Sequence, residues 1–134
     1  MKNKVIVTVE FDGTYSACIT QLPGCIAVAN TLPELRSLMS EAVELHIESL
    51  KTHNEEIPTD FMVDYELVYR LDTQGLLVTY DGIFTKSALS RMSGINEKLL
   101  WHYASGKKHP RPVQRQRIAS ALHTLGNELL TVEL

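Results

Sequence analysis

Residues 85–110 read TKSALSRMSGINEKLLWHYASGKKHP, and this stretch predicts two short helices joined by a tight turn. Gly94 suits the turn, because glycine adopts a positive φ without a steric penalty. Asn96 is a good N-cap for the second helix, since its side chain can accept from backbone N–H groups that lack a helical partner. Gly106 comes where a C-terminal glycine ends a helix. The inward-facing positions recur at roughly helical spacing and are Leu89, Ile95, Leu100 and Tyr103.

A basic loop follows the second helix. Two prolines restrict its backbone, and its basic residues are Lys107, Lys108, His109 and Arg111. Two short helices with a cationic rim predict a helix-turn-helix whose second helix lies in the major groove of DNA. Helix-turn-helix units also occur as plain packing modules, and the basic loop favours DNA binding over that alternative.

The same stretch resembles the lambda-repressor/Cro-like family. The pattern of that family begins with Thr-Gln and a Leu, continues with a turn glycine and a β-branched residue, and ends with a second glycine and a proline. The matching residues here, all in register, are Thr85, Leu89, Gly94, Ile95, Gly106 and Pro110. Lys86 stands where the family has Gln.

The register of the Cro-like family also implies which side chains contact DNA. The exposed positions at the start of the second helix would reach base edges, and they are Glu97, Lys98, Trp101 and His102. A lysine can donate to guanine, and a glutamate can accept from cytosine. Contacts to phosphate set the register rather than read sequence. The candidates for phosphate are Thr85, Lys86, Asn96, Ser105, Lys107, Lys108 and Arg111.

The charge of the chain is unevenly distributed. The 134 residues carry a formal net charge of −3. Residues 1–72 hold 5 Lys and Arg against 12 Asp and Glu, which gives −7, whereas residues 73–134 hold 8 against 4, which gives +4. The basic half suits phosphate and the acidic half suits a cationic protein surface. On its own, the imbalance is also compatible with two solvated surfaces.

The first half has the pattern of a small sheet with one helix. Alternating β-branched residues predict a strand over 4–11, and Asp12-Gly13 is a hairpin signal. Thr31 and Glu34 form a capping box that opens an amphipathic helix ending near Thr52. The remaining predicted strands cover residues 15–21, 25–29 and 61–71. The order is therefore βββαβ.

This order, together with two motifs, resembles the HicB antitoxin domain over roughly residues 3–70. The motifs are Leu-Pro-Gly-Cys at residues 22–25 and T-x-x-E-L at residues 31–35, with Glu41-Ala42 further along the helix. The resemblance implies a partial RNase H-like fold. Members of that family often carry a C-terminal DNA-binding module. We therefore expect an α+β chain with a HicB-like domain over 1–71 and an all-α helix-turn-helix domain over 72–134.

The C-terminal part of the chain completes the second domain. Helices are predicted over residues 73–80 and 113–125, with Gly126 stopping the latter. Residues 128–134 alternate and predict a terminal strand that pairs with a second copy, because a lone strand leaves its backbone groups unpaired. The dimerisation candidates on this strand are Leu130, Val132 and Leu134. A frayed end or a continuation of the helix is the alternative.

Other classes of site find little support in the sequence. Cys18 and Cys25 lack the spacing of a zinc site and lie in apolar, strand-like surroundings, so we expect neither a metal nor a disulfide. Glu10 and Asp12 lack further carboxylates to form a nuclease site, and no catalytic residue or cofactor is expected. No apolar run approaches the ~20 residues that span a bilayer, and no signal peptide is recognisable, so a cytoplasmic location is expected.

The HicB resemblance implies an antitoxin. The first domain would bind a HicA-type toxin, a small RNA-cleaving protein with a catalytic histidine. The second would bind operator DNA as a homodimer or higher even oligomer and repress its own operon. The alternative is a stand-alone transcriptional regulator whose first domain senses another ligand or protein.

Overall fold

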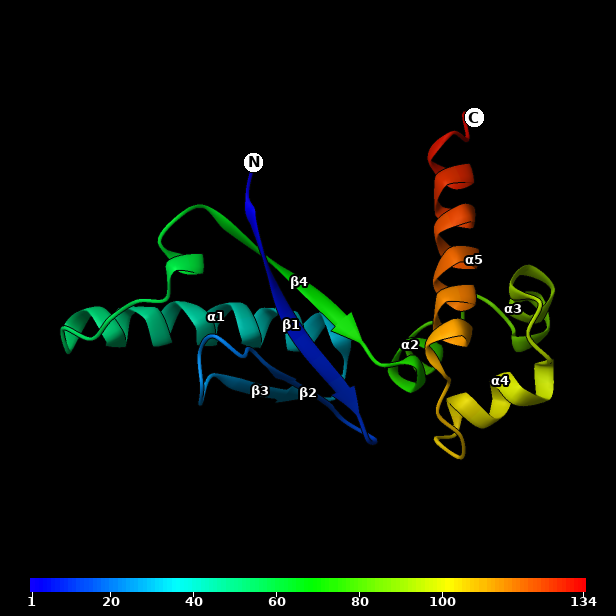
Figure 1. Cartoon of the computed structure of the whole chain (residues 1–134), viewed down its shortest axis with the longest axis horizontal. Helices are drawn as coiled ribbons and strands as arrows, with labels where there is room; N and C mark the ends of the chain where they lie inside the picture. Colours follow the sequence, from blue (N-terminus) through cyan, green and yellow to red (C-terminus); the bar gives the residue numbers. More distant parts are fainter. The chain divides into compact units, whose positions relative to one another are not determined.

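The computed structural model describes all 134 residues. The chain forms two compact units, Met1–Gly75 and Leu76–Leu134. Each unit has its own apolar core, built around a sheet and one helix in the first and around helices in the second (Figure 1). The unit boundary falls inside one short helix, α2 (Thr73–Thr79).

The first unit contains a four-stranded sheet in the order β3-β2-β1-β4. The strands are β1 (Asn3–Phe11), β2 (Tyr15–Cys18), β3 (Ile26–Ala29) and β4 (Tyr65–Leu71). β1 pairs antiparallel with β2 and parallel with β4, and β2 pairs antiparallel with β3. Every second residue of β1 is buried, namely Val5, Val7 and Val9. The predicted order βββαβ and the alternation along β1 are thus confirmed.

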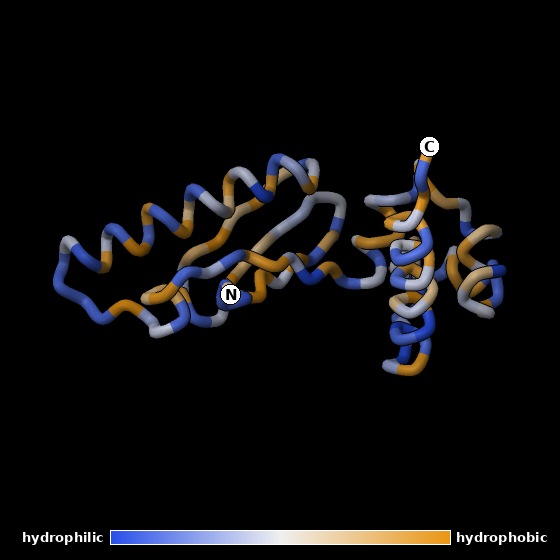
Figure 2. Tube along the Cα trace, turned by 90° about the horizontal axis from the view of Figure 1, so that it is seen from above, coloured by the Kyte–Doolittle hydropathy of each residue, from blue (hydrophilic) through white to orange (hydrophobic).

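A single long helix, α1 (Leu32–Thr52), covers one face of this sheet. The predicted cap is present, since the hydroxyl of Thr31 accepts a hydrogen bond from the backbone N–H of Glu34 at 3.3 Å. Figure 2 shows hydrophobic and hydrophilic residues alternating along the turns of this helix. Leu35, Met39 and Val43 are buried against the strands. Burying a side chain of this size stabilises the fold by about 1.5–3 kcal/mol.

The predicted strand over residues 61–71 is wrong in its first part. Residues Thr59–Phe61 form a 3₁₀ turn, and β4 begins only at Tyr65. Asp60 anchors this turn, because its carboxylate accepts from the side-chain amides of Asn3 at 3.1 Å and Gln21 at 3.0 Å. Phe61 is buried and packs edge-on against the ring of Tyr65, with 4.9 Å between the ring centroids. The turn therefore places Phe61 in the core, where a continued strand was expected.

The two cysteines occupy different environments. Cys25 is buried, and its burial raises the pKa of the thiol. Cys18 ends β2 and is exposed, so the expectation that both cysteines lie in apolar surroundings is wrong for this residue. Both thiols are free.

The second unit consists of the end of α2 and three further helices, α3 (Lys86–Ser93), α4 (Glu97–Ala104) and α5 (Pro112–Leu130). Its core residues come from all four helices and from the turn between α3 and α4. They are Leu77, Leu89, Ile95, Leu100, Tyr103 and Ile118. The core contains all four inward-facing positions predicted from the 85–110 stretch.

The predicted terminal strand is absent. Helix α5 runs through Gly126 to Leu130, and residues 131–134 form no strand. Gly126 does not stop the helix, because its backbone has no positive φ, and a Cβ built there would meet nothing within 4 Å. The helix ends instead at Thr131, whose hydroxyl donates to the carbonyl of Glu128 at 2.7 Å. The alternative of a continued helix was correct.

Two glycine substitutions should move stability in opposite directions. Gly94 has a φ of +75°, a conformation in which an added Cβ is strained, so Gly94→Ala should destabilise the protein by about 1–2 kcal/mol. Gly126→Ala should stabilise it by about 0.5–1 kcal/mol, because alanine is the better residue within a helix. Urea denaturation of both variants and the wild type measures the difference. A destabilising Gly126→Ala would place the end of α5 at residue 126.

Candidate functional site

The turn between α3 and α4 fixes the direction in which α4 leaves α3. Gly94 ends α3 in the left-handed conformation, and Ile95 places its side chain in the core. The hydroxyl of Ser93 accepts from the backbone N–H of Ile95 at 3.2 Å, while Ser90 donates to the carbonyl of Ile95 at 2.5 Å. Asn96 then caps α4, with its side-chain oxygen accepting from the N–H of Lys98 at 2.9 Å. These contacts set the direction of α4 relative to α3.

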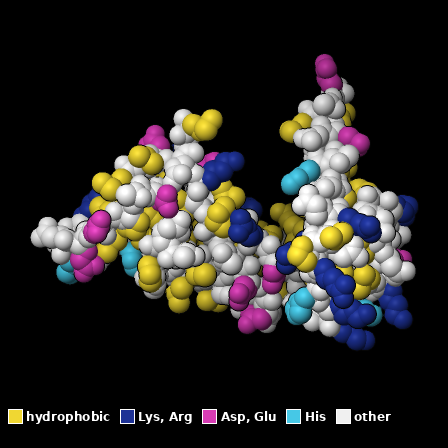
Figure 3. Space-filling view, in the orientation of Figure 1, with side chains coloured by type: hydrophobic (Ala, Val, Ile, Leu, Met, Phe, Trp, Pro, Cys, Tyr) yellow, Lys and Arg dark blue, Asp and Glu magenta, His cyan; other side chains and the backbone are white.

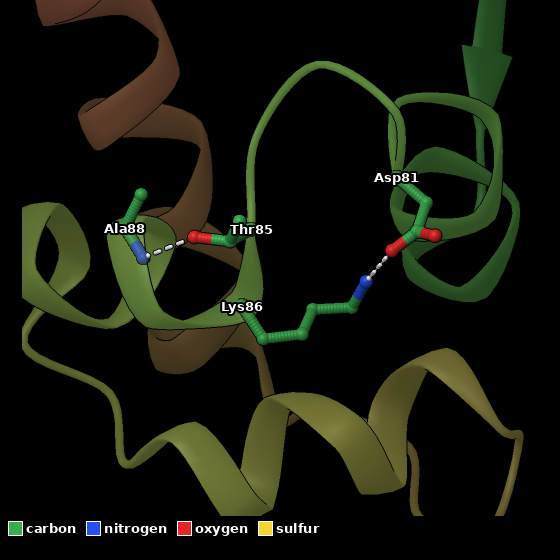
Figure 4. A network of polar contacts seen from close by, with 4 residues as sticks. All are labelled: Asp81, Thr85, Lys86 and Ala88. Carbon is green, nitrogen blue, oxygen red and sulfur yellow. Dashed lines mark hydrogen bonds and ion pairs between the residues drawn. The ribbon is translucent and has the colours of Figure 1, made fainter.

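A buried lysine lies at the start of α3, as Figure 4 shows. The side chain of Lys86 is only 3% exposed, and its ammonium pairs with the carboxylate of Asp81 at 2.6 Å. The same ammonium lies 4.7 Å from the ring centroid of Trp101 on α4, within the range of a cation–π interaction. The sequence predicted a phosphate contact at Lys86. In the structure this side chain turns inward instead, because Asp81 supplies an opposite charge close by.

The predicted base-contacting residues lie on one helix but differ in exposure. Glu97, Lys98 and Trp101 are exposed, Trp101 by 54%. His102 is half-buried, and its Nδ1 is buried without a hydrogen-bond partner. Desolvation, followed by the positive charges of Lys107, Lys108 and Lys98, lowers the pKa of His102 below its usual value. The imidazole is therefore neutral at neutral pH, so only one of its ring nitrogens carries a proton to donate.

Three of the predicted phosphate contacts have local structural partners. Thr85 caps α3 by accepting from the N–H of Ala88 at 2.9 Å (Figure 4), and Asn96 caps α4. Ser105 donates to the carbonyl of His102 at 3.1 Å. These side chains set the ends of the two helices.

The remaining predicted phosphate contacts are exposed cations, namely Lys107, Lys108 and Arg111. Figure 3 shows Lys and Arg side chains gathered at the lower end of this unit, over α4 and the loop that follows it. Sequence reasoning missed Arg115 as a member of this group. It is exposed one helical turn after Arg111, and that spacing, four residues at the start of a helix, was the available signal.

The first unit exposes carboxylates along α1 and near the hairpin after β1. Exposed carboxylates line the outside of α1 at Glu34, Glu41, Glu44 and Glu48. Glu10 and Asp12 are exposed at the end of β1 and in the hairpin turn. No group of three or more His, Cys, Asp or Glu side chains lies close enough together to hold a metal ion. None of the helices of either unit is long and apolar enough to cross a membrane.

This chain is similar to a known protein family and to several individual proteins. Residues 4–96 match the family described as HicB_like antitoxin of bacterial toxin-antitoxin system. A UPF0150 protein of Thermoplasma acidophilum is 45% identical over 60 residues, which cover 45% of this chain and 87% of the relative. A UPF0150 protein of Synechocystis is 34% identical over 59 residues, which cover 44% of this chain and 75% of the relative. A UPF0150 protein of Archaeoglobus fulgidus is 37% identical over 51 residues, which cover 38% of this chain and 74% of the relative. The match to the family extends over more than half of the chain. The chain therefore belongs to the HicB-like antitoxin family of bacterial toxin–antitoxin systems.

Proposed function

We propose that this protein is an antitoxin with two binding activities. The first unit binds and neutralises a HicA-type, mRNA-cleaving toxin, and the second unit binds the operator DNA of its own operon as a lambda-repressor/Cro-like helix-turn-helix. The observation that carries the proposal is the combination of membership in the antitoxin family with a separate helical unit of opposite charge. The predicted division of these roles between residues 1–71 and 72–134 stays a prediction, as does the likeness of the first unit to RNase H.

Charge supports the assignment of the toxin to the first unit. Residues 1–72 carry −7, and residues 73–75 add no charge, so the whole first unit has this value. A toxin that cleaves mRNA must present a cationic surface to its substrate. An acidic unit is electrostatically complementary to such a surface, which accelerates association and disfavours wrong partners.

The geometry of the second unit supports DNA binding through α4. The capped turn presents Glu97, Lys98 and Trp101 of α4 to solvent. In the proposed complex these side chains, together with the half-buried His102, would reach base edges in a major groove. The exposed cations Lys107, Lys108 and Arg111 follow directly and would contact phosphates. Lys86 is not in this set, because its charge is engaged by Asp81.

We further propose a homodimer that forms through the end of α5. Ile118, Leu122, Leu125 and Leu129 follow one another along a single face of this helix. The first of them is buried in the core, whereas Leu129 is exposed, and Leu130 beside it is 85% exposed. In Figure 1 the last turns of α5 rise beyond the other helices of the unit. Pairing of two such ends would bury Leu129, Leu130 and Val132 and give the two-fold symmetry of a palindromic operator.

Removal of base contacts should separate the two activities. Lys98→Ala combined with His102→Ala should weaken binding to a duplex from the promoter of the protein's own operon by about 100-fold, since specific base contacts contribute about 1–3 kcal/mol each. Neutralisation of the toxin, measured as rescue of growth on co-expression, should persist. Lys51→Ala, an exposed lysine on α1, is the matched control. Loss of both activities together would contradict the division of roles. If the wild-type chain fails to rescue growth on co-expression with the toxin, the result would favour a stand-alone regulator.

Removal of a phosphate contact should act differently. Lys107→Ala should weaken binding to specific and unrelated duplexes alike, and it should lower the slope of log K against log salt concentration by about one. Electrophoretic mobility-shift titrations at several salt concentrations measure the affinity for each duplex and its salt dependence. A loss confined to the promoter duplex would instead identify Lys107 as a base contact.

The proposed dimer has a simple test. Leu129→Glu combined with Leu130→Glu should convert the dimer to a monomer, because burying two unpaired carboxylates is strongly unfavourable. Sedimentation velocity at micromolar concentration measures the mass, and Ile83→Glu, an exposed apolar residue outside α5, is the control. A wild-type monomer, or an unchanged dimer in the double variant, would exclude this interface.

A further inference from the structure

We propose that the toxin docks in a groove between the edge strand β3 and helix α1 of the first unit. This inference rests on the proposed antitoxin function and assigns it a surface. The groove has a volume of about 270 Å³. It is lined mainly by apolar residues of the two elements, with one carboxylate: Ile26, Ala27, Val28, Leu38, Glu41, Ala42 and Leu45.

The strand side of the groove is an open sheet edge. β3 pairs with β2 on one side and has no strand on the other. Ile26 and Val28 are 65% and 56% exposed. Their side chains project from the sheet face opposite α1, because their register partners Cys18 and Ser16 pair with Thr8 and Glu10 rather than with the buried valines of β1. An exposed apolar edge presents backbone donors and acceptors to another chain. It is therefore suited to an extended segment of a partner, which would add a fifth strand.

The helix side carries a stripe of alternating acidic and apolar residues. Glu34, Leu38, Glu41, Leu45 and Glu48 are spaced by four and three residues, which places them on one face of α1. This stripe lies away from the core, and all five side chains are exposed, Leu45 by 60%. No Lys or Arg belongs to the stripe. The leucines of the stripe offer apolar contact area, and the carboxylates make the stripe negatively charged.

Charge decides between the two possible occupants of the groove. In a two-fold contact between copies of this chain, the same patch would meet itself. The stripe would then bring three carboxylates of one copy toward three of the other, and such like-charge contacts are costly. A basic partner meets the same stripe with complementary charge. The toxin, whose substrate is a polyanion, is the partner with that chemistry in the proposed function.

The experiment compares two double variants of the full-length chain that alter charge and apolar surface equally. Glu41→Lys with Leu45→Lys changes the groove. Glu66→Lys with Val63→Lys makes the matching charge reversal and apolar-to-lysine replacement at exposed positions of the same unit, outside the groove. The probe is the cognate HicA-type toxin in a catalytically inactivated form, and its affinity for each variant is measured by calorimetry. Circular dichroism and binding to the promoter duplex report that both variants are folded.

The groove variant should bind the toxin about 100-fold more weakly than the wild type, whereas the control should stay within about threefold, because like charges placed in an interface cost several kcal/mol. Equal affinity of the two variants would overturn the proposed surface. A groove variant whose oligomeric state alone changes would assign the groove to a second copy and would also overturn the inference. If the wild type itself does not bind the toxin, the proposed function fails, and that outcome is distinct from the other two.

Discussion

The second unit depends on the burial of Ile95 in the turn between α3 and α4. Truncating such a buried side chain to alanine costs about 2–5 kcal/mol in typical cores. Because Gly94 supplies the left-handed bend and two serine hydroxyls bond the backbone of Ile95, the turn has one conformation in which its donors and acceptors are satisfied. The direction of α4, and with it the exposed face proposed to read DNA, follows from that single inward-pointing residue.

The two units have separate apolar cores and carry opposite surface charges. Each unit buries its own apolar residues, so the surface charge of one is independent of the packing of the other. The acidic residues of α1 sit outside the sheet-covering face, and six of the eight Lys and Arg residues of the second unit sit on α4, the following loop and the start of α5. Opposite charges on separate units fit a protein proposed to hold a basic protein and a nucleic acid at the same time.

Local signals predicted the parts of the fold that are fixed by local chemistry. The caps at Thr31 and Asn96, the bend at Gly94 and the alternation along β1 were predicted from residue type and spacing, whereas the cap at Thr85 was not, because that residue was expected to contact phosphate. The inward turn of Lys86 could not, because it depends on Asp81, a residue beyond the predicted motif. Likewise, glycine at position 126 gives no information on φ, and alternation over residues 128–134 fits a helix end as well as a strand. The burial of Phe61 depends on Asp60, which accepts hydrogen bonds from residues 39 and 57 positions away in the sequence.

The contact of Lys86 with Trp101 has an optical consequence. Trp101 is the one tryptophan of the chain, and its indole lies over an ammonium on one side while remaining half open to solvent. Its emission spectrum therefore reports on the polarity at a single point of α4, free of overlap from other indoles. An unlabelled sample carries its own chromophore on the helix proposed to enter the groove, and quenching by iodide or by stacked bases can be followed there directly.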